Sequence, residues 1–163
     1  METEKQWISS KVLFSAISDQ LAENRQAVFT VTGMSMWPFM CHGRDQVIVE
    51  KVDQDSLKIG DIVLFRTTEE RYTLHRITRL EEDFFQTTGD GNLLRDRPML
   101  YDSIIAKVNK VVRKGKTIDC SSRKWKILSR TWMLLFPIRK YLLKFLKNFS
   151  RMKQRLLNAI KSH

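Results

Sequence analysis

The sequence of 163 residues contains no apolar run that is long enough to cross a bilayer. A membrane-spanning helix needs about 18 or more apolar residues in succession, whereas the longest apolar block here is Trp132–Ile138, which includes Pro137. The N-terminal residues METEKQW begin with acidic side chains, and no apolar stretch follows them. We therefore expect a cytoplasmic protein that has neither a secretory signal peptide nor a transmembrane helix.

Acidic residues are almost absent from the last third of the chain, which carries the whole excess of positive charge. Residues 1–112 hold 14 Lys/Arg and 17 Asp/Glu, whereas residues 113–163 hold 15 Lys/Arg and a single acid, Asp119. The formal net charge of +11 is thus a property of the C-terminal segment. This asymmetry predicts a near-neutral folded body followed by a cationic arm.

Cysteine and histidine are both rare. Cys41 and Cys120 could form one disulfide, but two free thiols in a reducing compartment are the simpler expectation. His163 ends the chain and His42 lies in a turn, whereas His75 lies within the strand-like sequence RYTLHRIT. We expect neither a metal ion nor a cofactor.

Between residues 27 and 112 the composition is that of a β-sheet protein. Segments rich in Val, Ile, Phe and Thr are separated by short turn-forming stretches such as CHGRD and KIGD. Because no helical pattern interrupts them, we expect a compact, mainly β fold. An amphipathic helix should precede it at residues 6–23, where Trp7, Leu13, Phe14, Ile17 and Leu21 recur at helical spacing. The expected strands cover residues 27–32, 46–52, 61–67, 71–80, 83–88 and 103–112.

After Lys116 the pattern becomes helical. SSRKWKILSRTWMLLFP predicts a helix that is capped by Ser121 or Ser122 and interrupted at Pro137. The following segment predicts a second helix with an apolar face opposite a basic face. The apolar face comprises Ile138, Leu142, Phe145, Phe149, Met152, Leu156 and Ile160, and the basic face comprises Lys140, Lys144, Lys147, Arg151 and Arg155.

This basic amphipathic arm is compatible with two uses. It could contact an anionic membrane surface through residues 122–161, with apolar side chains in the headgroup region and lysines near the phosphates. It could equally pack against the body and leave its basic face in solvent. The charge alone would also attract nucleic acid, but the continuous apolar stripe argues against that partner.

Four polar residues are candidates for chemistry. Ser35 lies in the sequence TGMSMWPF, where Pro38 excludes a long regular helix and Gly33 allows a tight loop. His75 lies within a strand, and Asp90 and Asp96 follow in the loop GDGNLLRD. Each of them also has a purely structural interpretation, as a turn hydroxyl, a half-buried strand histidine or a turn carboxylate.

Taken in order, the motifs around these residues resemble those of the S24/S26 serine peptidases, which include LexA-like proteins and signal peptidases. The sequence GMSMWP at residues 33–38 resembles the box around the nucleophilic serine, and HRI at residues 75–77 resembles the box around the base. Five boxes in register over residues 27–112 are far more specific than any one of them. The other matching segments are Gly43–Asp45 with VIVEKV, Lys58–Phe65, Thr88–Asn92 with Asp96, and the closing strand Ile104–Val112.

The resemblance implies a compact signal-peptidase-like or LexA-like β-fold in which Ser35 is the nucleophile. Many relatives use lysine as the base, but His75 stands in the corresponding box here, as in the endoplasmic-reticulum and archaeal branch. Arg76 cannot act as the base, because a guanidinium does not lose its proton in proteins. Asp96 is the first choice for the acid that orients His75, and Asp90, the second choice, is better suited to shaping the loop.

The resemblance also implies that substrate and oxyanion are bound next to the serine by backbone amides, at Gly33, Met34 and Met36. We therefore expect a serine endopeptidase of the signal-peptidase-like type that cleaves a leader or signal-like peptide. The alternative is a catalytically inactive S24/S26-like domain used for binding or regulation. The expected parts are an N-terminal helix at 1–26, a catalytic β-domain at 27–118 and a basic helical arm at 119–163.

Overall fold

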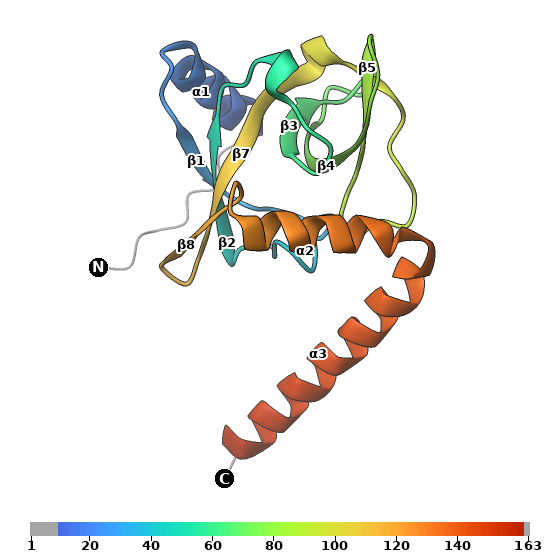
Figure 1. Ribbon diagram of the computed structural model, residues 1–163. Coiled ribbons are helices and arrows are strands. Elements are labelled where there is room, and N and C mark those ends of the chain that lie inside the picture. Colours follow the sequence, from blue (N-terminus) through green and yellow to red (C-terminus); the bar gives the residue numbers. More distant parts are fainter. Residues whose placement is uncertain (1–9, 162–163) are drawn as a thin grey trace, which may run out of the picture.

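One curled antiparallel β-sheet forms the body of the protein (Figure 1). The computed structural model describes the backbone of residues 10–161 and the side chains of residues 12–152. Eight strands in this range follow the order β1-β2-β7-β3-β4-β5-β6, and β8 pairs with β7. The mainly β fold agrees with the prediction. The strands are β1 (Ala27–Thr30), β2 (Asp45–Glu50), β3 (Ile62–Arg66), β4 (Tyr72–Leu80), β5 (Phe84–Thr88), β6 (Met99–Leu100), β7 (Ile104–Arg113) and β8 (Lys116–Asp119).

The six predicted strands all form, with ends within about two residues of the expected ones. Two short strands were not predicted. β6 has only two residues, which is too short to produce an alternating pattern. β8 pairs with the end of β7 through a turn at Lys114 and Gly115, whose φ angles are positive. The sequence from Lys116 onward, which we interpreted as helical, therefore begins with a strand.

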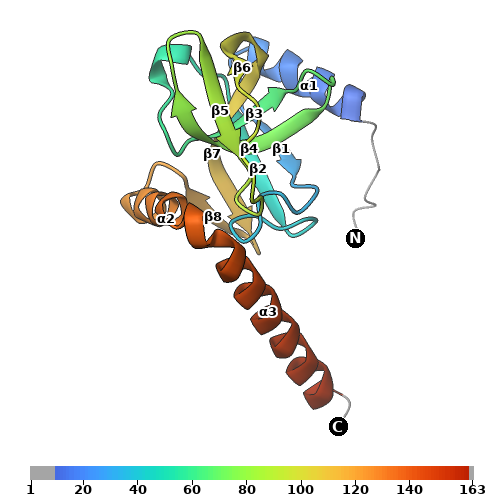
Figure 2. The same cartoon turned by 90° about the vertical axis from the view of Figure 1, so that its right-hand side faces the viewer.

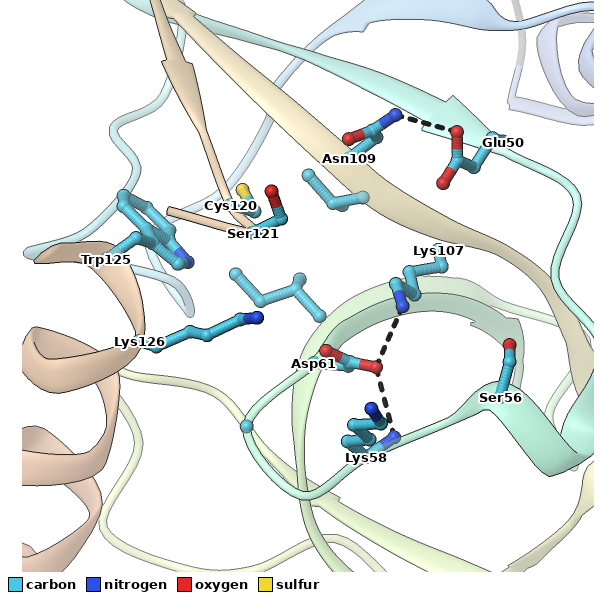
Figure 3. Close-up of a pocket in the computed structure, with 13 residues that line it drawn as sticks. Glu50, Ser56, Lys58, Asp61, Lys107, Asn109, Cys120, Ser121, Trp125 and Lys126 are labelled. Atoms are coloured by element: carbon cyan, nitrogen blue, oxygen red, sulfur yellow. Dashed lines mark hydrogen bonds and ion pairs between the residues drawn. The ribbon is translucent and has the colours of Figure 1, made fainter. Parts of the chain in front are cut away.

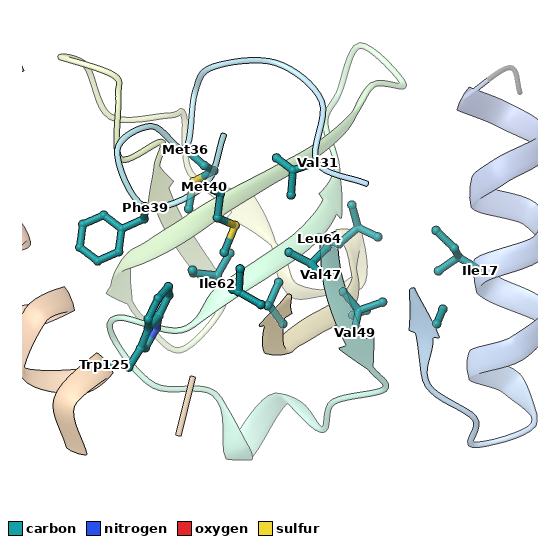
Figure 4. Packing of buried hydrophobic residues seen from close by; sticks show 14 of the residues in the cluster. Ile17, Val31, Met36, Phe39, Met40, Val47, Val49, Ile62, Leu64 and Trp125 are labelled. Atoms are coloured by element: carbon teal, nitrogen blue, oxygen red, sulfur yellow. The ribbon is translucent and has the colours of Figure 1, made fainter. Parts of the chain in front are cut away.

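β3 separates two hydrophobic clusters, because its side chains alternate between the two faces of the sheet. Ile62 and Leu64 belong to the larger cluster, whereas Val63 and Phe65 belong to the smaller one. Register shifts at Leu64/Phe65 and elsewhere increase the local twist, which lets the sheet curl around its own side chains. The larger cluster lies between α1, the sheet and α2, and its labelled members are drawn in Figure 4.

The N-terminal helix α1 (Ser10–Ala22) packs on the sheet beside β1. Its buried residues include Ile17 and Leu21, which are four residues apart. Phe14 stacks on Tyr72 with ring centroids 3.9 Å apart and meets Phe29 edge-on. The predicted helix began at residue 6, and its first residues, including Trp7, lie outside the described part of the chain.

Two helices follow β8 and are separated by a bend at Pro137, as the sequence predicts. α2 (Arg123–Leu134) is capped by Ser122, whose hydroxyl accepts from the amide of Trp125. α3 (Arg139–Lys161) then leaves the body as a long single helix in both views (Figures 1 and 2). Short 3-10 turns complete the elements: η1 (Gln54–Ser56), η2 (Tyr101–Ser103) and η3 (Phe136–Ile138).

None of the helices within residues 10–161 combines the length and the apolar content that a bilayer crossing requires. α3 is long enough, but basic side chains interrupt its apolar residues.

Candidate active site

Ser35 lies in the loop that connects β1 to β2. The base of this loop is closed by two backbone hydrogen bonds, from Val31 to Asp45 and from Gly43 to Val31. The loop is anchored in the larger hydrophobic cluster by Met36, which is almost fully buried (Figure 4). Ser35 itself is only half-buried. The neighbouring core residue therefore fixes the loop while the serine remains within reach of solvent.

His75 and Asp96 lie in direct contact. His75 Nδ1 is 2.6 Å from Asp96 Oδ2, and the same oxygen accepts a hydrogen bond from the Thr87 hydroxyl. The backbone of Asp96 is also held by β5, because its amide donates to the carbonyl of Thr87 and its carbonyl accepts from Gln86 Nε2. This support fixes the carboxylate, and with it the ring nitrogen that faces it, so that Nε2 points away from Asp96.

The turn at Gly89 brings the serine loop and the histidine together. A Cβ atom added to Gly89 would lie 2.6 Å from the Ser35 carbonyl oxygen and 2.9 Å from His75 Nε2. Only glycine fits at such a close approach. The Ser35 carbonyl also accepts from the amide of Gly91 at 2.7 Å, which joins the two loops. Within residues 10–161 the Ser35 hydroxyl makes no hydrogen bond to His75.

Asp90 faces the opposite way and pairs with Arg76. The two side chains form two parallel hydrogen bonds, Nε–Oδ1 at 2.9 Å and Nη2–Oδ2 at 2.7 Å, and each is only 1% exposed. Arg76 Nη1 also donates to the Gly60 carbonyl and to the Ser129 hydroxyl of α2. Asp90 is therefore bound to the neighbour of His75 rather than to His75.

The C-terminal helices support the same turn from behind. Trp132 Nε1 on α2 donates to the Asp90 carbonyl at 3.1 Å. Arg139, the first residue of α3, donates to the carbonyls of Gly89 and Asn92, each at 3.3 Å, and is 2% exposed. Both ends of the turn that touches Ser35 and His75 are thus held by the arm.

Two shallow cavities flank His75. One has a volume of about 230 Å³ and is lined by Ser35, Asn92 and the Tyr72–His75 segment of β4. The other has a volume of about 410 Å³ and is lined by Asp96, Arg95 and Arg97 on the far side of the ring. His75 lines both cavities, so the imidazole can be reached from either one.

Comparison with protein families identifies the fold. The family described as Peptidase S24-like matches residues 3–90, which is more than half of the chain. The chain belongs to the Peptidase S24-like family. The matched range contains Ser35, His75 and Asp90 and ends before Asp96. None of the curated proteins matches the chain closely.

The backbone amides around the serine of this S24-like protein differ in their availability. The Gly33 amide donates to His42 Nδ1 at 3.1 Å, so it is already occupied. The amides of Ser35 and Met36 have no acceptor within residues 10–161. Met34 is exposed, whereas the Met36 side chain lies in the core and can contribute only its backbone. The Met34 amide has no acceptor there either, so Met34, Ser35 and Met36 carry the free amides of this loop segment.

A third cavity, of about 180 Å³, lies between α2 and the sheet (Figure 3). Asp61 pairs with Lys107 at 3.1 Å, and Glu50 accepts from Asn109. Burial raises the pKa of the Cys120 thiol to about 12, which makes it a poor nucleophile. Asp61 and Glu50 are thus paired, whereas the ammonium groups of Lys58 and Lys126 have no ion-pair partner among the described residues of this S24-like protein.

Sequence reasoning missed three supports of the site in this S24-like chain. Thr87 anchors Asp96, and its only sequence signal is a hydroxyl at the end of a predicted strand. Trp132 and Arg139 lie more than 40 residues from the turn that they hold, so no local pattern connects them to it.

Proposed function

We propose that this S24-like protein is a serine endopeptidase in which Ser35 is the nucleophile and His75 the general base. The observation that carries the proposal is the 2.6 Å contact between His75 Nδ1 and Asp96 Oδ2. A carboxylate in this position fixes the tautomer of the ring and stabilises the imidazolium that forms during the reaction. No lysine is found among the described residues that line the two cavities beside the ring, which favours histidine as the base.

The proposed reaction begins with transfer of the Ser35 proton to His75 Nε2 as the oxygen attacks the scissile carbonyl. The free amides of Met34, Ser35 and Met36 are available to stabilise the negative oxygen of the tetrahedral intermediate. The proton then passes from His75 to the leaving amine, and water releases the acyl group by the same steps in reverse order. The missing contact between Ser35 and His75 is compatible with this sequence, because catalytic hydrogen bonds often form only with substrate bound.

An extended peptide is the substrate that best fits the surface. β4 pairs with β3 along Tyr72–Arg76, but its pairing with β5 begins only at Arg76. The Tyr72–His75 segment therefore has one free edge, and that edge borders the cavity that contains Ser35. A peptide that pairs with this edge would carry its backbone past the serine. We propose a leader or signal-like peptide of the kind cleaved by signal-peptidase-like enzymes.

Labelling with a fluorophosphonate probe tests the proposed nucleophile. The probe should label the wild-type protein, and Ser35→Ala and His75→Ala should abolish labelling while the circular dichroism spectrum stays unchanged. Ser56→Ala removes an exposed serine outside the two cavities and should be labelled like the wild type. Full labelling of Ser35→Ala would refute the proposal.

The runner-up is a catalytically inactive S24-like domain that binds peptides or regulates another protein. The absence of a Ser35–His75 hydrogen bond within residues 10–161 is the observation that favours it. Incubation with a peptide library, followed by mass spectrometry, distinguishes an active peptidase from an inactive domain. An inactive domain would retain peptides without cleaving them, and Ser35→Ala would not alter the binding.

A further inference from the structure

The part of α3 that leaves the body carries unpartnered apolar side chains. Three of them, Phe145, Phe149 and Met152, lie on one side of the helix, and Ile138 precedes them in η3. These four residues, which we call the exposed stripe, are 48–66% exposed. Leu143, on another side of the helix, is buried against the body. The body therefore covers one face of α3 near its start, and the rest of α3 extends away from the body (Figure 2).

The same helix carries exposed positive charges and no compensating acid. Lys140, Lys144, Lys147 and Arg151 are all exposed. None of them forms an ion pair within the described residues. The sequence beyond Asp119 contains no Asp or Glu, so no carboxylate of the arm can neutralise them. A partner for this helix must offer both an apolar environment and negative charge.

We propose that α3 binds in the plane of an anionic bilayer surface, with the exposed stripe in the headgroup and acyl boundary. The apolar side chains and the basic side chains lie on opposite faces of α3, which matches a helix that lies on a membrane rather than one that crosses it. The lysines on the opposite face add attraction to anionic headgroups.

Charge argues against the other occupants of the stripe. A second copy would bring one strongly positive helix against another, and like charges at a contact oppose association. Nucleic acid offers negative charge, but it has no apolar surface that would cover two phenylalanine rings. A bilayer that contains anionic lipid supplies both requirements at once.

Co-sedimentation of the full-length protein with vesicles tests this docking. Vesicles that mix phosphatidylglycerol with phosphatidylcholine should bind the protein at least tenfold more tightly than pure phosphatidylcholine vesicles, because several basic residues face the surface. Phe145→Glu/Phe149→Glu should weaken binding at least tenfold, since each ring loses its apolar contact. The control Val28→Glu/Ile59→Glu adds the same two negative charges at exposed apolar residues of the body. Apart from the effect of these charges, it should bind vesicles as tightly as the wild type, because the exposed stripe is intact.

The salt concentration separates the electrostatic contribution to vesicle binding from the apolar contribution. Lys144→Gln/Lys147→Gln should weaken binding on the order of tenfold at low salt and should reduce its salt dependence. Phe145→Glu/Phe149→Glu should remain at least tenfold weaker than the wild type at every salt concentration, because most of its defect is the loss of apolar contact. Ser35→Ala should bind vesicles like the wild type, so docking and peptidase activity can fail independently.

Two results would overturn the proposal. One is equal vesicle binding by Phe145→Glu/Phe149→Glu and by its control. The other is dimerisation in analytical ultracentrifugation that this variant abolishes, together with no vesicle binding by the wild type. The second result would assign the exposed stripe to another copy of the chain.

Discussion

Two hydrogen-bonded pairs, each with one carboxylate, start from neighbouring residues of β4 and differ in almost every other property. His75 pairs with Asp96 beside open cavities, and the two side chains are 8% and 26% exposed. Arg76 pairs with Asp90 on the opposite face of the strand, where both are 1% exposed and α2 covers them. Successive side chains of a strand point to opposite faces, so one residue step separates a reactive environment from a sealed one.

The two acids of the loop after β5, Asp90 and Asp96, have different roles. Asp90 fixes the turn by holding a buried guanidinium, and Asp96 meets the ring that faces the serine loop. The Arg76–Asp90 pair keeps Gly89 against Ser35, and the His75–Asp96 pair leaves the imidazole beside the two cavities. We therefore expect the Arg76–Asp90 pair to control stability and the His75–Asp96 pair to control activity.

Asp96→Asn should give the largest effect, and it should be on activity. An amide at this position can donate to His75 Nδ1, which favours the tautomer whose Nε2 already carries a proton and cannot accept one. We expect kcat to fall by about 10²–10⁴-fold, with the free energy of unfolding changed by less than about 1 kcal/mol. Peptide cleavage rates and urea denaturation measure the two quantities. A normal kcat in this variant would remove Asp96 from the mechanism.

Arg76→Met should give the next largest effect, on stability. It leaves the Asp90 carboxylate buried without its partner, which typically costs about 3–5 kcal/mol. The double variant Arg76→Met/Asp90→Asn should recover part of that loss, because it also removes the buried charge. Urea denaturation of both variants checks the prediction. A loss below about 1 kcal/mol in Arg76→Met would show that the pair does not hold the fold.

The sequence predicted strands and site residues correctly where the sequence pattern was local. Alternation of Val, Ile and Phe located six strands within about two residues of their ends. The pairing of His75 with an acid followed only from the order of motifs, since Asp90 and Asp96 lie on one loop and composition does not separate them. The structure separates them by register, because Arg76 lies opposite Thr88 and its side chain reaches the first acid.

The unpredicted part consists of long-range contacts. Trp132 and Arg139 were read as members of amphipathic helices, and their spacing carries no information about a turn near residue 90. β8 was missed because its pairing depends on a positive φ at Lys114, where the sequence shows only a Lys-Gly turn. Tertiary packing decides such features, and a local sequence pattern contains no information about contacts between distant residues.

A second buried acid, Asp45, extends the comparison between stability and activity. Asp45 accepts hydrogen bonds from Arg44, Arg113 and the Cys41 amide at the base of the serine loop. Burial alone would raise its pKa, but these hydrogen bonds outweigh it and lower the pKa well below the ordinary 3.8. A lowered pKa means that the carboxylate stabilises the fold above about pH 4 and that this contribution is lost as the pH falls below that value.

Asp45→Asn should therefore destabilise the protein by about 1–3 kcal/mol at neutral pH, and the difference from the wild type should shrink as the pH falls below about 4. Urea denaturation between pH 2 and pH 7 measures this difference. Asp119→Asn is the control, because the pKa of Asp119 is also lowered, by its hydrogen bonds with Ser121, but the side chain is exposed. If the difference in unfolding free energy between Asp45→Asn and the wild type did not change with pH, the stabilising role of the Asp45 carboxylate would be contradicted.

Arg139→Met should have the smallest effect, and it should fall on the rate rather than on the fold. Arg139 has no carboxylate partner among the described residues, its Nε atom makes no hydrogen bond, and burial lowers its pKa. Loss of this cation should therefore change the free energy of unfolding by less than about 1 kcal/mol. The carbonyls of Gly89 and Asn92 lose their donor, so the turn that touches Ser35 and His75 should loosen and kcat should fall by roughly tenfold.

The control Arg130→Met removes an exposed arginine of α2 and should leave kcat unchanged. Arg139→Lys restores the charge and one donor, so it should recover part of the rate. Both methionine variants should bind anionic vesicles alike, whereas Phe145→Glu/Phe149→Glu should lose vesicle binding and keep its kcat on a soluble peptide. If Arg139→Met instead lowers stability and rate together, and Arg139→Lys rescues neither, then Arg139 supports the fold as a whole and does not position the turn.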